Sequence, residues 1–68
     1  MVVRFIEVLR VGLFKKSLKE LGFKEMTSVP NVGDIIHRKD DKWEVVWKRF
    51  IFDSDQGDYV QIFMKPIK

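Results

Sequence analysis

The segment WEVVWKRFIF, residues 43–52, has the alternating pattern of a β-strand, but its large apolar residues change parity partway along. Trp43 and Trp47 occupy odd positions, whereas Phe50 and Phe52 occupy even positions. Because side chains of a strand alternate between two faces, a regular strand cannot place all of these aromatic side chains on one face. The chain must therefore either bulge within this segment or leave some of them on its outer face.

A β-bulge at Lys48 and Arg49 is the first prediction. It directs both cations outward and lets Trp47 and Phe50 point inward. It also bends the strand, as happens when a small sheet curls towards a barrel and encloses an aromatic interior. This prediction makes the parity change the point at which the chain wraps around its core.

The alternative keeps the strand straight. Val46, Phe50 and Phe52 then lie inside, and Trp43 and Trp47 lie on the outer face. Two outward indoles four residues apart would form a platform for a binding partner. The pattern of residues 43–52 leaves both interpretations open.

Residues 13–21 have a different periodicity from the rest of the chain. Phe14, Leu18 and Leu21 follow the spacing of one helix face, with lysines on the opposite side. Gly22 suits the left-handed position just after a helix C-terminus. We therefore expect a short helix at about 13–21; the alternative is a second strand that leads into a long loop.

The remaining segments indicate strands joined by turns. A β-branched run opens the chain, and turn residues separate the later strands. The fold class expected is mainly β (α+β), in the order β-α-β-β-β, as a small SH3-like barrel or curled antiparallel sheet in a single domain, residues 1–68. The expected strands are residues 2–11, 34–38, 43–53 and 59–65, and the last three form an antiparallel meander.

The composition restricts the environment and the partners. The chain has 68 residues and no cysteine, which excludes disulfides and thiolate metal sites. Charged residues interrupt every apolar run, so neither a signal peptide nor a membrane span is expected, and a cytoplasmic location is favoured. The net charge is +3, and residues 1–25 carry six Lys/Arg against three Asp/Glu, an excess of three. This mild bias is typical of a solvated face and is weaker than in dedicated nucleic-acid domains.

No pattern indicates catalysis, a metal or a cofactor. His37 is the only histidine and has no partner at the spacing that nucleophilic catalysis needs. The acidic stretch DSDQGD, residues 53–58, has Gly57 and Asp58 in the wrong order for a calcium loop and is interpreted as a hairpin turn. Each glycine is isolated, so there is no phosphate-binding loop. We expect no catalytic residue, no metal, no cofactor and no small-molecule substrate.

A binding surface is the function that the pattern favours. An apolar patch beside the second hairpin would engage a protein partner or a second copy of the chain, unless the predicted helix covers it. Nucleic acid is the alternative partner, because basic and aromatic residues are available for phosphate contacts and base stacking. No membrane partner is expected. The candidate partner-binding residues are Ile51, Tyr59, Phe63, Lys48, Arg49 and Lys65.

The C-terminal half carries a recurring pattern of a proline-glycine-aspartate turn and strand, a Trp-x-Val strand and a Val-x-Ile strand. Its residues here are Pro30, Gly33, Asp34, Ile36, Trp43, Val45, Val60 and Ile62. Over residues 29–65 the chain resembles small phage-encoded SH3-like β-barrel proteins of unknown function. That type has no shared active site, so no functional residue carries over. The resemblance implies a non-enzymatic accessory protein of a phage or mobile element, which works by binding in the host cytoplasm.

Overall fold

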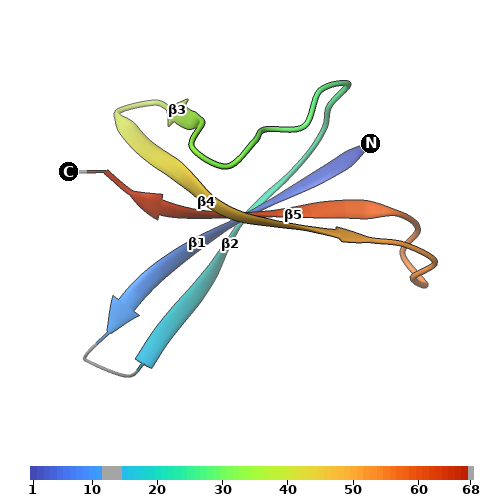
Figure 1. The fold of residues 1–68 in the computed structure, drawn as a ribbon, viewed down its shortest axis with the longest axis horizontal. Helices are drawn as coiled ribbons and strands as arrows, with labels where there is room; N and C mark the ends of the chain where they lie inside the picture. The colour runs from blue at the N-terminus through green and yellow to red at the C-terminus, as the bar shows by residue number, and fades with distance from the viewer. Residues whose placement is uncertain (12–14, 68) are drawn as a thin grey trace.

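Strands make up the regular structure of the residues that the structure describes. The computed structural model describes residues 1–11 and 15–67. The strands form one curled sheet in the order β2-β1-β5-β4-β3 (Figure 1). The prediction of a mainly β fold is confirmed. The strands are β1 (Val2–Val11), β2 (Lys15–Glu25), β3 (Ile35–Arg38), β4 (Asp41–Ile51) and β5 (Tyr59–Pro66).

β1 and β5, the first and last strands along the chain, lie side by side inside the sheet. β1 and β2 form an antiparallel hairpin, and β3, β4 and β5 form the predicted antiparallel meander. β5 also pairs with β1, and this pairing is parallel. The expectation of a wholly antiparallel sheet is therefore wrong, because the parallel β1–β5 pair joins the two antiparallel halves.

The predicted helix is wrong where the structure describes it. Residues 15–21 belong to β2, and residues 13 and 14 lie outside the described residues. A helix this short is marginal in isolation, whereas β2 satisfies the backbone along the whole length of β1. Gly22, at φ +123°, lies beside a register shift in this hairpin rather than after a helix. The part of the chain that the structure describes has no helix long and apolar enough to cross a membrane.

The parity change in β4 is produced by a bulge at Val46. Val45 lies opposite Met64 on β5, and Trp47 lies opposite the adjacent residue, Phe63. Val46 is thus the extra residue, and every side chain after it changes face. Val45 is held on its other side as well, where its amide donates to the carbonyl oxygen of Asp34 at 2.9 Å.

The bulge lies two residues earlier than predicted. Lys48 and Arg49 pair regularly with Ile62 and Gln61, so the proposed bulge at these two cations is wrong. Because paired residues of neighbouring strands share a face, Lys48 and Arg49 also point to opposite faces. The kink was expected between Trp47 and Phe50 and lies instead between Val45 and Trp47, and this position decides which residues become exposed.

The two tryptophans lie on opposite faces of the sheet. Trp43 is 6% exposed in the core, whereas Trp47 is 51% exposed on the other face. Phe50 is paired with the core residue Val60 yet remains 44% exposed, and it stacks with Phe52 at a ring-centroid distance of 6.2 Å. The straight-strand alternative, with both indoles outside, is therefore wrong, and so is the expectation that Trp47 points inward.

The core lies on one face of the sheet, called the inner face below. Trp43 contributes to it, and its indole nitrogen donates to Glu7 Oε2 at 2.6 Å, which satisfies the polar edge of a buried ring. Met26 and Val29, from the segment between β2 and β3, pack against the same core. The fully buried core side chains come from β1, β4 and β5 and are Val3, Val45, Val60, Ile62 and Met64.

The segment of residues 26–34 crosses the inner face and is fastened at both ends (Figure 1). At its start, the amide of Met26 donates to the Met1 carbonyl oxygen at 2.9 Å. Further along, Lys48 Nζ donates to Asn31 Oδ1 at 2.8 Å. The inner face is thus partly covered by this segment, and the opposite face, called the outer face below, carries Trp47.

Leu18→Asp and Leu21→Asp distinguish β2 from the predicted helix. Leu18 is 61% exposed, whereas Leu21 packs against the core. We expect Leu18→Asp to lower the free energy of unfolding by no more than about 1 kcal/mol. Leu21→Asp, which brings a charge against apolar neighbours, should lower it by at least about 2 kcal/mol. Urea denaturation measures both, and equal large losses would indicate the amphipathic helix instead.

Candidate functional site

The structure brings five of the six candidate binding residues onto the outer face. Ile51 lies opposite Tyr59, and Arg49 lies opposite Gln61 on the same face. Lys65 and Phe63 follow on β5 at alternate positions, where the strand places them on that face too. Lys48 is the exception, because the bulge at Val46 turns it to the inner face, where it bonds Asn31.

An aromatic pair forms the centre of the outer face. The ring centroids of Trp47 and Phe63 are 4.6 Å apart, with the ring planes inclined by 48°. Ile6 of β1 lies opposite Phe63 across the parallel strand pair. Phe63 and Ile6 are 7% and 9% exposed, whereas Trp47 is half-exposed. The outer face therefore has its own small apolar cluster, and an indole forms the exposed part of it.

Arg49 is held in place beside this cluster. Its Nε and Nη2 atoms both donate to Gln61 Oε1, at 2.9 and 2.6 Å. The guanidinium carbon lies 5.7 Å from the Trp47 ring centre and 6.0 Å from that of Phe63, within cation–π range. Within residues 1–11 and 15–67, Arg49 forms no ion pair with a carboxylate. Its positive charge is therefore available to a partner.

A second arginine and aromatic pair lies near the end of the same strands. The Arg4 guanidinium carbon lies 4.7 Å from the Tyr59 ring centre. Unlike Arg49, Arg4 is ion-paired, with Nη1 3.6 Å from Glu20 Oε1, and it also donates to Gln56 Oε1. Its Nε is buried and has no hydrogen-bond partner among the described residues. Contacts on several sides hold this side chain against the sheet.

The outer rim of the face is polar and charge-balanced. Lys65 Nζ lies 3.5 Å from Glu44 Oε1, and both side chains are partly exposed. An exposed pair of this kind contributes little to stability, but it leaves the rim without a dense positive field. Apolar centre and polar rim together are the usual anatomy of a protein interface.

Sequence reasoning missed Ile6, Arg4 and Gln61 as parts of this face. β1 contributes two of them through its parallel pairing with β5, a contact between opposite ends of the chain. Trp47 was considered for an outer platform, but together with Trp43. The sequence did contain a signal for Ile6. Val3 and Ile6 occupy odd and even positions of the first strand, so an apolar residue lies on each of its faces.

The residues considered for catalysis or metal binding remain dispersed turn and edge residues. The 53–58 segment closes the β4–β5 hairpin, as predicted. A hydrogen bond within the turn, from Asp53 N to Asp58 Oδ1 at 2.9 Å, stabilises it. His37 is exposed on the edge strand β3. No group of three potential metal ligands occurs within residues 1–11 and 15–67.

Comparison of the chain with protein-family models, with curated proteins and with solved structures finds no match.

The exposure of the two indoles predicts distinct fluorescence in single-tryptophan variants. Trp43→Phe leaves Trp47, which should be quenched readily by acrylamide because half of its surface is open to solvent. Trp47→Phe leaves Trp43, which should emit at shorter wavelength and resist quenching. Similar quenching constants in the two variants would contradict the placement of the tryptophans on opposite faces.

Proposed function

We propose that this protein is a non-catalytic binding module that engages a protein partner through its outer face. The observation that carries the proposal is the half-exposed Trp47, packed on Phe63 and flanked by Arg49. Tryptophan, tyrosine and arginine are the residues that most often dominate the energy of protein interfaces. All three types occur on this face.

The side chains of the outer face are ordered before a partner arrives. Gln61 fixes the guanidinium of Arg49 with two hydrogen bonds, and Phe63 supports the Trp47 ring. Side chains that are already fixed lose little conformational entropy on binding, which increases affinity for a given contact area. The chemistry favours a partner that offers an apolar surface to Trp47 and a carboxylate to Arg49.

Two further expectations accompany this proposal. The origin in a phage or mobile element, with a cytoplasmic location in the host, stays a prediction from the resemblance of residues 29–65. The SH3-like barrel also stays a prediction, supported by the β3–β4–β5 meander. The edge strands β2 and β3 are bridged by a hydrogen bond from Arg38 Nη1 to the Leu21 carbonyl oxygen, at 3.3 Å.

Affinity capture from a bacterial lysate, with matched variants, tests the proposed interface. Ile51→Asp and Arg49→Glu change the outer face, whereas Val32→Asp places the same new charge at an exposed apolar residue elsewhere. We expect the wild-type chain and Val32→Asp to capture the same partner. Each of the two outer-face variants should capture at least tenfold less of it. Retention that is equal in all four proteins would exclude this face.

Sedimentation of the purified chain tests whether the partner is a second copy. Self-association through the outer face predicts a mass above that of one 8.1 kDa chain, which Ile51→Asp should reduce to the monomer. A monomer at every concentration would leave a different protein as the partner. A stable oligomer unaffected by Ile51→Asp would contradict self-association through this face.

Single-stranded nucleic acid is the second candidate, favoured by the guanidinium groups that lie against Tyr59 and Trp47. Against it, Arg4 and Lys65 are already paired with carboxylates, so few cations remain for phosphates. Binding to a mixed oligonucleotide should fall steeply with added salt and be abolished by Arg49→Glu. Lys48→Glu, on the inner face, is the matched control. No binding at low salt would exclude this candidate.

A further inference from the structure

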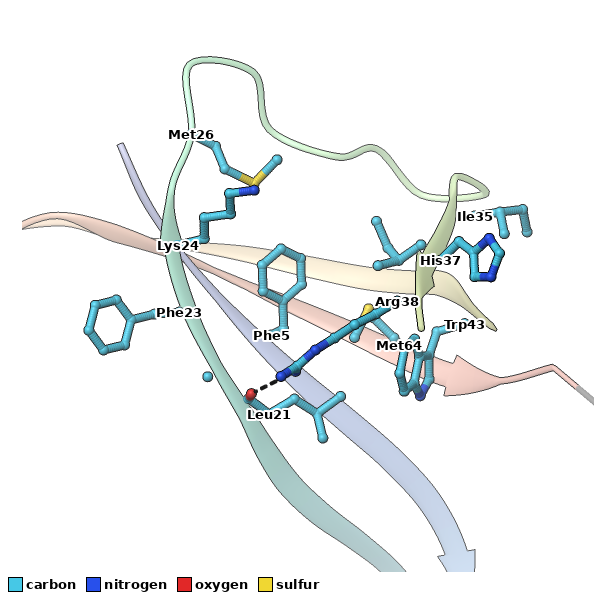
Figure 2. A pocket seen from close by; sticks show the side chains of 12 residues that line it. Phe5, Leu21, Phe23, Lys24, Met26, Ile35, His37, Arg38, Trp43 and Met64 are labelled. Atoms are coloured by element: carbon cyan, nitrogen blue, oxygen red, sulfur yellow. Dashed lines mark hydrogen bonds between the residues drawn. The ribbon is translucent and has the colours of Figure 1, made fainter. Parts of the chain in front are cut away.

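A groove separates the two edge strands of the curled sheet, away from the outer face. It has a volume of about 770 Å³, and β2 and β3 form its two sides. Phe5, Trp43 and Met64 form its apolar floor, which is continuous with the inner-face core (Figure 2). Leu21 and Ile36 contribute from the sides. The groove is therefore the place where the sheet has not closed.

A single side chain bridges this opening. Arg38 of β3 extends across it, and its Nη1 donates to the Leu21 carbonyl oxygen of β2 at 3.3 Å (Figure 2). A side chain, rather than direct backbone pairing, thus spans the distance between the two edges. Inserting one strand between two others requires two strand spacings, about 9.5 Å in total. An extended arginine side chain together with its 3.3 Å hydrogen bond spans a distance of this order.

Both sides of the groove are open strand edges. β2 and β3 are the first and last strands in the sheet order, so each has one edge without a neighbouring strand. Such edges present backbone donors and acceptors that pair readily with an extended peptide. Leu21 shows that a backbone carbonyl on this side accepts a hydrogen bond from another segment.

The charge of the groove selects the occupant. Its lining includes Lys24 and Arg38 together with His37, and the lining residues include no carboxylate. β2 carries four lysines and two glutamates, so pairing with β2 of a second copy would bring two net positive strands together. An extended segment with carboxylates is complementary to the groove.

We infer that the groove between β2 and β3 receives an extended acidic segment of another protein as an added strand. In an extended segment, alternate side chains would enter the apolar floor, and carboxylates would meet Lys24 and Arg38. The incoming backbone would replace Arg38 at the Leu21 carbonyl oxygen and release its guanidinium to a carboxylate. This site is separate from the outer face and goes beyond the function proposed above.

Titration of a synthetic peptide into the ¹⁵N-labelled full chain tests the inference. The probe is a capped peptide of about ten residues with alternating valine and glutamate, and the comparison peptide has lysine in place of glutamate. We expect the acidic peptide alone to shift amide resonances of residues 21–24 and 35–38 and to slow their hydrogen exchange. Shifts confined to the outer face, or equal binding of both peptides, would overturn the inference.

Charge reversal on the two sides of the groove provides the matched variants. Lys24→Glu and Arg38→Glu should each weaken binding of the acidic peptide by at least tenfold. Lys24→Glu leaves the Arg38–Leu21 bond intact, so its effect does not depend on that contact. Lys16→Glu, on β2 but outside the groove lining, should leave the affinity within twofold of the wild type.

Two further outcomes would overturn the inference. The first uses decanoate, an anionic amphiphile without a peptide backbone. If decanoate shifts the groove resonances and the acidic peptide does not, the groove does not recognise a strand. Slowed exchange at β2 that depends on protein concentration without added peptide would assign the groove to a second copy. Because Ile51 and Arg49 lie elsewhere, variants of the outer face should leave peptide binding unchanged, so the two proposals fail independently.

Discussion

The extra residue at Val46 is the constraint on which the arrangement of both faces depends. Without it, Trp43, Val45 and Trp47 would share one face, and a cavity the size of the inner core would have to hold a second indole. With it, Trp43 completes the inner core, and Trp47 covers Phe63 on the outer face. The same change of face separates Lys48, which fastens the 26–34 segment, from Arg49, which lies beside the exposed indole.

A chain of 68 residues has little apolar surface to bury, and this fold distributes it unequally. The inner face is filled by five fully buried side chains and covered by the 26–34 segment. On the outer face, Ile6 and Phe63 are buried and Trp47 remains half-exposed. The apolar surface that stays exposed on the outer face would release free energy if a partner covered it.

The two surfaces differ in the kind of recognition that they offer. The outer face presents side chains that are already fixed by neighbours, such as Arg49 on Gln61, so it suits a partner of complementary shape. The groove between β2 and β3 presents backbone edges bridged by one flexible side chain, Arg38, so it suits an extended segment. Among the described residues, neither Arg49 on the outer face nor Lys24 in the groove is paired with a carboxylate, which is why an acidic partner is proposed for each surface.

Local patterning by itself determined the strands of the C-terminal half and their antiparallel meander, because alternation and turn residues act over a few positions. It also placed Ile51, Tyr59 and Phe63 together, since a hairpin relates them directly. The parity change in residues 43–52 allowed a bulge or a straight strand, and only the tertiary structure decided between them. Tertiary structure decided what depends on distant partners. Residues 15–21 became a strand because β1 offered an edge that outweighs a weak helical preference. The bulge lies at Val46 because Val45 pairs with Met64 on one side and bonds Asp34 on the other. Arg4 and Ile6 lie on the outer face because β1 pairs with β5. Such contacts join positions far apart in the chain, so the periodicity of either segment alone cannot reveal them.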